Sequence, residues 1–176
     1  TEKMDGENTT IYRDGIHARS LDYSPHQSRD WVRALQGRIG HELPEGWRLC
    51  GENLWAKHSL GYDNLEDYFL VFSLWDAKNV CRSWDETCEW AELLGLKTVP
   101  VLTVSHPNNR GDLDLWCQLM NFAGDPAKQE GYVVRDAGSF HYRDFRNHAA
   151  KYVRASHVQT HGHWMRQKVI PNKVKP

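Results

Sequence analysis

A lysine at position 3 has neighbours that suit a nucleophilic role. Lys3 lies two residues before an Asp-Gly pair, Asp5 and Gly6, and Glu2 directly precedes it. A lysine amine can attack a phosphorus atom once its ammonium has lost a proton. Because free lysine titrates near ~10.4, the site must favour the neutral amine through burial, a nearby cation or a metal ion. The pattern therefore indicates covalent group transfer.

Carboxylates and basic side chains further along the chain could complete such a site. Divalent metal ions that bridge phosphates are held by carboxylate oxygens. The candidate carboxylates are Asp5, Glu52 and Glu130. Charge that builds up on a transferred phosphate is stabilised by lysine or arginine. The candidates for that role are Arg135, Lys151 and Arg154.

An aromatic side chain would have to stack on the base of a nucleotide substrate. The apolar run 68–76 reads as a strand, and Phe72 lies at its centre. Phe72 is the first choice, but an aromatic residue in an apolar strand is most often part of the core. Phe69 or Trp75 could provide the stacking ring instead.

Five short motifs, taken in order, resemble those of the ATP-dependent RNA ligase family, a minimal single-domain branch of the covalent lysine nucleotidyltransferases. The resemblance extends from residue 2 to about residue 164. One such match alone would favour exposed charge on a strand or turn, whereas five in order favour a shared function. The motifs are Lys3-Met4-Asp5-Gly6, Ala18-Arg19-Ser20, Gly51-Glu52, Glu130-Gly131-Tyr132-Val133-Val134-Arg135 and Ala150-Lys151-Tyr152-Val153-Arg154.

The resemblance implies a role for each motif. It implies that Lys3 becomes adenylated and that Lys151 contacts the AMP phosphate, so these two lysines are the expected catalytic residues. It also implies ATP as the nucleotide, and Mg²⁺ or Mn²⁺ as a metal ion held by Glu130 and Asp5. The expected nucleotide-binding residues are Glu2, Lys3, Asp5, Gly6, Arg19, Glu52, Phe72, Glu130, Arg135 and Lys151.

The chain departs from the family pattern in two places. The fifth motif commonly has a second lysine two positions after the first, where this chain has Val153. Arg154 follows, but the alternation of a regular strand would direct it to the opposite face. Family members also carry a segment before the first motif, whereas Thr1 and Glu2 alone precede Lys3, which fits a chain numbered from inside a longer protein.

Predicted strands outnumber predicted helices, and the helices are scattered between the strands. The expected fold class is therefore α+β, with antiparallel sheets flanked by helices. The resemblance implies a nucleotidyltransferase domain of the ATP-grasp-like ligase adenylation type, which we place at residues 1–155, followed by a polar C-terminal tail at 156–176. The predicted strands are 2–12, 16–21, 47–55, 68–75, 97–104, 131–136 and 149–154, and the predicted helices are 29–40, 84–94 and 112–122.

Two helix starts have recognisable caps. Ser28 can cap the helix at 29–40, and Ser83 with Glu86 three residues later forms a capping box before the helix at 84–94. Three basic residues, Arg29, Arg33 and Lys57, could form part of an RNA-binding surface. Charged residues of this kind are more often simply exposed to solvent.

Composition limits the possible classes of protein. The chain has 176 residues and a formal net charge of −1, so an RNA site must be a local basic patch. No apolar run reaches the ~20 residues of a membrane helix, and no signal peptide is visible. The four cysteines lie in apolar stretches without a CxxC pair, which predicts reduced thiols and a cytoplasmic protein. They are Cys50, Cys81, Cys88 and Cys117.

The function implied by the resemblance is ATP-dependent joining of RNA that has 5′-phosphate and 3′-hydroxyl ends, through lysyl-AMP and RNA-adenylate. A DNA ligase or a capping-type nucleotidyltransferase is one alternative, but these usually add an oligonucleotide-binding domain after the fifth motif, and only a short stretch follows Arg154 here. A non-catalytic nucleotide- or RNA-binding module is the other. His161 and His163 lack the spacing of a zinc site, which favours a polar tail.

Overall fold

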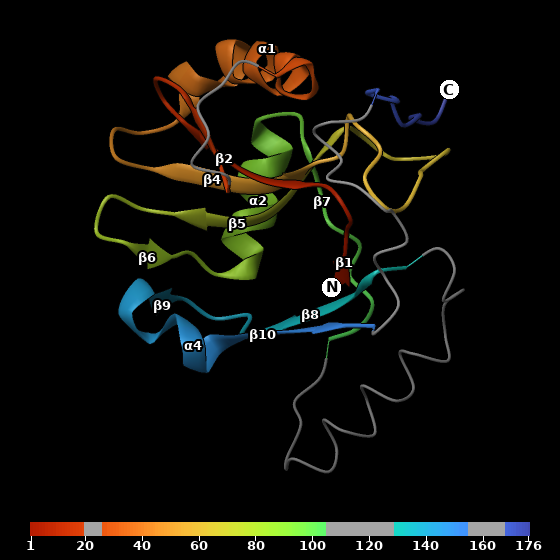
Figure 1. Cartoon of the computed structure of the whole chain (residues 1–176). Helices are drawn as coiled ribbons and strands as arrows, with labels where there is room; N and C mark the ends of the chain where they lie inside the picture. The colour runs from red at the N-terminus through yellow and green to blue at the C-terminus, as the bar shows by residue number, and fades with distance from the viewer. Residues whose placement is uncertain (20–25, 105–128, 155–167) are drawn as a thin grey trace.

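Two β-sheets frame the chain in the computed structural model, which describes residues 1–19, 26–104, 129–154 and 168–176 (Figure 1). The predicted helix at 112–122, together with Cys117, His161 and His163, lies outside the described residues. The described part is an α+β structure with largely antiparallel sheets and few helices, which confirms the fold class expected from the sequence.

The larger sheet has seven strands within the described residues, in the order β3-β2-β4-β5-β6-β9, with β7 parallel to β5. Buried and more exposed positions alternate along β2, as expected of a strand with one face on the core. Every residue of β5 is buried except Phe72. The strands are β2 (Glu7–Tyr12), β3 (Ile16–Ala18), β4 (Arg48–Asn53), β5 (Phe69–Trp75), β6 (Val80–Cys81), β7 (Lys97–Thr98) and β9 (Phe140–His141).

Two helices pack their apolar stripes against this sheet (Figure 1). They are α1 (Asp30–Ile39) and α2 (Trp84–Leu93). Val32, Leu35 and Ile39 recur at helical spacing on α1 and are buried, while Ala91 is the buried contact of α2. The main core comprises Ile11, Val32, Leu35, Ile39, Leu43, Leu49, Phe69, Val71, Leu74, Ala91 and Leu96.

The two predicted caps have different outcomes. The Ser83–Glu86 capping box is confirmed, with the Glu86 N–H donating to Ser83 Oγ at 3.2 Å and the Ser83 N–H donating to Glu86 Oε2 at 3.1 Å. The Ser28 cap of α1 is wrong, because Ser28 lies inside a preceding 3-10 turn, η1 (Gln27–Arg29), and Arg29 occupies the cap position. His26 caps that turn instead, since its side chain accepts the Ser28 N–H.

The smaller sheet has three strands within the described residues, in the order β1-β8-β10, all antiparallel. They are β1 (Glu2–Lys3), β8 (Gly131–Arg135) and β10 (Ala149–Val153). Between β8 and β10 the chain returns to the larger sheet, through β9, the 3-10 turn η3 (Tyr142–Asp144) and α4 (Phe145–His148). A further 3-10 turn, η2 (Gly40–Glu42), follows α1.

Two predicted strands are too long. The strand at 2–12 is broken at residues 4–6, because the chain leaves the smaller sheet after Lys3 and enters the larger sheet at Glu7. The strand at 97–104 is reduced to Lys97–Thr98. The Val99 N–H still donates to the Val71 carbonyl at 2.9 Å, but Pro100 follows it and has no N–H to continue the ladder.

The described end of the chain packs onto the segment between β4 and β5. Pro171 and Val174 form isolated bridges with Ala56 and Leu65. Asn172 is 4% exposed, and its side chain donates to the Leu54 carbonyl at 2.8 Å. Residues 171–174, which the sequence placed in a polar tail, therefore contact the domain, and Figure 1 shows the C-terminus beside this segment.

The described cysteines are free thiols, as predicted: Cys50 and Cys81 are buried and Cys88 is partly buried. Burial raises the pKa of the Cys81 thiol to about 11, which keeps it protonated and poorly reactive at neutral pH. Among the residues that the structure describes, no helix combines the length and the apolar character required to cross a bilayer.

Candidate active site

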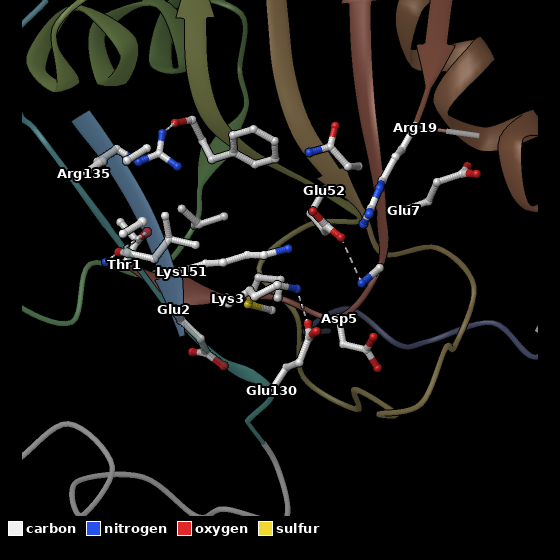
Figure 2. Close-up of a pocket in the computed structure, with 18 of the residues that line it drawn as sticks. Thr1, Glu2, Lys3, Asp5, Glu7, Arg19, Glu52, Glu130, Arg135 and Lys151 are labelled. Carbon is white, nitrogen blue, oxygen red and sulfur yellow. Dashed lines mark hydrogen bonds and ion pairs between the residues drawn. The ribbon is translucent and has the colours of Figure 1, made fainter. Parts of the chain in front are cut away.

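A pocket lies where the chain crosses from the smaller sheet to the larger one. Its volume is about 850 Å³, within the size range of small-molecule sites. Figure 2 shows side chains from both sheets in it. Each nucleotide-binding residue predicted from the sequence lines this pocket: Glu2, Lys3, Asp5, Gly6, Arg19, Glu52, Phe72, Glu130, Arg135 and Lys151.

The register of the smaller sheet explains why two distant lysines meet here. Lys3 pairs with Gly131, and Lys151 pairs with Val133, two residues further along β8. Residues two apart on a strand share a face, so Lys3, Val133 and Lys151 all lie on the pocket side. Arg135 is two residues further on and belongs to the same face.

The other face and the end of this sheet hold the remaining residues of the fourth and fifth motifs. Tyr132 and Tyr152 stack there with ring centroids 5.0 Å apart, and strand alternation assigns Glu2 to their side. In Figure 2 the Glu2 carboxylate points away from the Lys3 amine, so Glu2 contributes to the rim of the pocket. Val153 lies in the row of Lys3 and Gly131, while Arg154 comes after β10 and does not line the pocket.

Lys3 and Glu130 form an ion pair at the centre of the site. The Lys3 Nζ donates to Glu130 Oε2, and the two side chains are 22% and 8% exposed. Figure 2 shows the pair at the lower side of the pocket, with Lys151 extending toward it from β10. The Lys3 amine is thus partly buried and held by a carboxylate, rather than freely solvated at the surface.

The larger sheet supplies the facing wall. Asn8 pairs with Glu52 across β2 and β4, and the Arg19 N–H donates to the Asn8 carbonyl at 2.9 Å. These three residues therefore occupy one row across the sheet, and all of them line the pocket. Figure 2 shows the Arg19 guanidinium reaching down past Glu52.

The Glu52 carboxyl is held at the junction of the two walls. Its Oε1 accepts the Gly6 N–H at 3.1 Å. Burial raises its pKa to about 8, although the Lys3 charge and the Gly6 N–H oppose that rise. Glu52 is consequently protonated in much of the free protein at neutral pH, and it can donate a hydrogen bond as well as accept one.

A β-bulge directs Phe72 into the pocket. Cys50 pairs with Ser73 and Gly51 pairs with Val71, so Phe72 has no partner on β4. Bulges commonly re-aim a side chain next to a site. Phe69 is 0% exposed and Trp75 is 4% exposed, so of the three aromatic residues considered from the sequence, Phe72 is the one that lines the pocket.

Arg135 braces Phe72. Its guanidinium donates to the Phe72 carbonyl and lies over the Phe72 ring, with 5.6 Å from Cζ to the ring centroid. It also lies 5.8 Å from the centroid of Trp84 at the start of α2. Arg135, a candidate phosphate ligand from the sequence, thus contacts the aromatic wall in the structure and holds Phe72 in place.

Asp5 anchors the crossover between the sheets. Its Oδ2 accepts the Leu60 N–H at 2.6 Å, and its own N–H donates to the Tyr62 hydroxyl at 2.9 Å. Figure 2 shows the carboxylate turned away from the Lys3–Glu130 pair. These bonds fix the direction in which the chain leaves Lys3.

Three motif glycines stand where the structure has no room for a side chain. A Cβ on Gly6 would lie 2.6 Å from the Asn53 carbonyl oxygen, and one on Gly51 would lie 2.4 Å from the Phe69 ring. A Cβ on Gly131 would lie 2.0 Å from the Tyr152 carbonyl oxygen. The glycines of the first, third and fourth motifs therefore permit close approach of the segments that form the pocket.

The donor set fits a metal ion that is shared with a phosphate substrate. Among the described residues, no group of three or more His, Cys, Asp and Glu side chains could hold a metal ion alone. Mg²⁺ commonly takes one or two carboxylates and completes its shell with water and substrate phosphates. Glu130, whose carboxylate lies in the pocket beside Lys3, fits that arrangement, whereas the Asp5 carboxylate is already bonded to a backbone N–H.

The pocket also contains residues that the sequence did not single out. Asn8 could have been found, because it lies two residues after Gly6 in a predicted strand, and residues two apart on a strand share a face. His58 and Phe145 had no motif around them, and they reach the pocket only through the path of the chain in space.

A comparison with protein families gives a match. The family model described as RNA ligase matches residues 1–153. No curated protein and no solved structure matches the chain. The matched region contains the pocket residues from β1 to β10, and the chain belongs to the RNA ligase family.

Proposed function

We propose that the protein is an ATP-dependent RNA ligase that works through a lysyl-AMP intermediate on Lys3. The observation that carries this proposal is the convergence of Lys3, Glu52 and Lys151, from three different strands, on one pocket of nucleotide size. Family membership supports RNA as the substrate and ligation as the reaction in general. The proposal includes a nucleotidyltransferase fold, ATP as the nucleotide, and RNA with 5′-phosphate and 3′-hydroxyl ends.

The reaction consists of three displacements at phosphorus. The Lys3 amine attacks the α-phosphorus of ATP, an N–P bond forms, and pyrophosphate leaves with the electrons of the broken P–O bond. A 5′-phosphate oxygen of RNA then attacks the same phosphorus, and Lys3 leaves as the restored amine. Finally a 3′-hydroxyl attacks the activated 5′-phosphate, releases AMP and closes the strand.

The two walls divide the work of holding the nucleotide. Phe72 offers a ring face on which adenine can stack. Glu52 and Arg19 lie in one row and can contact the ribose and the phosphates. Lys151 shares the face of Lys3 and can neutralise charge on the α-phosphate as it builds up.

A divalent cation belongs at Glu130. Mg²⁺ or Mn²⁺ bound there would neutralise phosphate charge and help pyrophosphate to leave. Lys3 now donates to the same carboxylate, so its Nζ must leave Glu130 before it can reach the α-phosphorus. Asp5, the other predicted metal ligand, acts in this proposal through the crossover that it anchors.

The direct test is the intact mass of the protein after incubation with ATP and Mg²⁺. Wild type should gain one AMP, and Lys3→Ala should gain none. Lys78→Ala is a matched control, because Lys78 is an exposed lysine outside the pocket, and it should label like wild type. GTP in place of ATP should give little adduct. An AMP adduct that persists in Lys3→Ala would remove this lysine from its role.

A second test separates RNA from DNA as the substrate. An A-form end is recognised through its shape and its 2′-hydroxyl groups. Nicked duplexes with ribose or deoxyribose on either side of the break should therefore seal only when the 3′-hydroxyl strand ends in ribonucleotides, while the 5′-phosphate strand tolerates DNA. Equal sealing of an all-DNA nick, measured on a gel, would favour the DNA ligase alternative.

A further inference from the structure

Two aromatic rings are exposed beside the pocket. The Tyr142 and Phe145 residues are 60% and 42% exposed, and both lie on Trp75, which is 4% exposed. The ring centroids of Tyr142 and Phe145 lie 5.6 and 6.2 Å from that of Trp75. Together with Phe140, these residues form what we call the aromatic platform.

The aromatic platform is held firmly by its backbone. Trp75 is the last residue of β5, and the other three rings belong to β9, η3 and α4, which lie beside β6 and run into β10 (Figure 1). His141 pairs with Val80, and the Tyr142 N–H donates to the Asn79 carbonyl at 2.9 Å. His148 stacks on Phe140 at 4.6 Å between ring centroids. Rings fixed in advance lose little conformational entropy when a ligand binds to them.

Basic residues lie within the platform segment. Arg143 has a side chain that is 77% exposed, and Arg146 is exposed as well. Arg143 makes one solvent-exposed contact with Asp144, at 3.4 Å, and contacts of this kind are weak. On a protein whose net charge is −1, this is a local cationic feature next to exposed aromatic rings.

The platform is continuous with the proposed reaction site. Phe145 lines the pocket, together with Ala149, Ala150 and Lys151, which follow it on the chain. A strand of RNA that ends in the pocket can therefore run directly onto the platform. Stacking rings next to basic side chains are the pattern of single-stranded nucleic-acid binding, because every base offers a ring face.

We propose that Tyr142 and Phe145 stack bases of single-stranded RNA next to the end that is joined, while Arg143 and Arg146 contact its phosphates. The proposal deepens the proposed function and rests on it, because it takes the pocket as the site of joining. A stacking contact to one base is worth about a fivefold to a hundredfold change in binding.

The first experiment measures binding of a fluorescent oligoribonucleotide to the full chain by anisotropy. Tyr142→Ala should weaken binding about tenfold, whereas Tyr142→Phe, which keeps the ring, should bind like wild type. Leu93→Ala is a control for removal of an exposed apolar side chain, since Leu93 is 73% exposed on α2. AMP uptake from ATP should be unchanged in Tyr142→Ala, because Tyr142 does not line the pocket.

The second experiment examines the arginines through salt. Replacing Arg143 and Arg146 by serine should weaken binding and make it less sensitive to salt, with a slope of log Kd against log salt that falls by about 1–2. Arg38→Ser is the control, because Arg38 is an exposed arginine on α1 that does not line the pocket.

The possible results separate the two proposals. If Tyr142→Ala and the double arginine variant bind and seal RNA like wild type, the platform does not hold RNA, and a protein partner becomes the better occupant. If wild type takes up no AMP from ATP, the proposed function fails, and the anisotropy measurements still decide whether the platform binds RNA.

Discussion

The two sheets that face each other across the pocket differ in what they contribute. The smaller sheet is only partly buried: Tyr132 is the one buried residue of β1, β8 and β10, and the pocket side of this sheet presents charged groups. The larger sheet is the core of the protein, and it presents Glu52 and Phe72 from strands that are otherwise largely buried. The lysines of the pocket therefore come from the smaller sheet and its most buried wall from the larger one, and the two sheets are joined at residues 4–6.

This division predicts that substitutions on the smaller sheet affect chemistry more than stability, and that those at the crossover affect both. The strongest contrast is between the two carboxylates predicted as metal ligands. Glu130 contacts the Lys3 amine, and Asp5 contacts the Leu60 N–H.

Glu130→Gln should show the largest effect. AMP uptake should fall at least a hundredfold, because the amide cannot replace a carboxylate at a cation. The free energy of unfolding should change by only about 1 kcal/mol, since the amide oxygen can still accept from Lys3. Rapid-quench labelling and urea unfolding measure the two quantities.

Asp5→Asn is the matched comparison. Its amide oxygen can still accept the Leu60 N–H, so AMP uptake should stay within about tenfold of wild type. Asp5→Ala leaves that buried N–H without its partner and should cost about 1–3 kcal/mol of stability. If Asp5→Asn instead loses AMP uptake as Glu130→Gln does, then Asp5 is a metal ligand, as the sequence suggested.

The next effect in size is at the crossover itself. Gly6→Ala places a Cβ 2.6 Å from the Asn53 carbonyl oxygen and 3.0 Å from Glu52 Cγ. Such overpacking costs about 1–3 kcal/mol, and the strain separates Glu52 from the Gly6 N–H. The rate of AMP uptake should therefore fall about tenfold, which corresponds to a rise of about 1.4 kcal/mol in the activation free energy.

Gly37→Ala is the control for this substitution. Gly37 lies in α1 with nothing within 4 Å of an added Cβ, so alanine should leave AMP uptake unchanged and raise stability by up to ~1 kcal/mol. Equal stability of Gly6→Ala and wild type would show that the crossover adapts easily, contrary to the proposed coupling of the two sheets.

The sequence was informative about residue types and much less so about the path between them. The motif residues were identified partly from their chemical groups and partly from the resemblance of five ordered motifs to a family, and strand alternation explains why Lys3 and Lys151 share a face. The break after Lys3 was missed, because the alternation of residues 2–12 does not reveal that one strand is shared between two sheets.

Features that depend on pairing partners had no signal in the sequence. The bulge at Phe72 exists only in the register of β4 against β5, and the two-residue strands β6 and β9 are too short to show a period. Arg29, considered as an RNA-facing residue, is instead 3% exposed and donates to Glu7, with Nε 2.9 Å from Oε2. Distant partners of this kind cannot be read from local composition.

The smallest predicted effect concerns Glu52 and pH. Burial raises its pKa to about 8, from an ordinary value of 4.5. Between these values the folded protein holds a proton that the unfolded chain has lost, so the free energy of unfolding should fall as pH rises through this window. Glu52→Gln cannot titrate, and its stability relative to wild type should therefore rise from pH 5 to pH 9, by roughly 1–2 kcal/mol, because solvent reaches the pocket.

Glu66→Gln is the control for replacing a glutamate by glutamine where the pKa is not raised. Glu66 is exposed, and its hydrogen bond with Lys175 lowers its pKa below the ordinary value of 4.5, so its carboxyl is largely ionised in both states above about pH 5.5. The stability of Glu66→Gln relative to wild type should stay constant over that range. Urea unfolding of both variants at pH 5.5, 7 and 8.5 makes the comparison. If the stability of Glu52→Gln relative to wild type did not change with pH, Glu52 would be ionised in the folded protein. Both walls of the pocket would then present ionised groups.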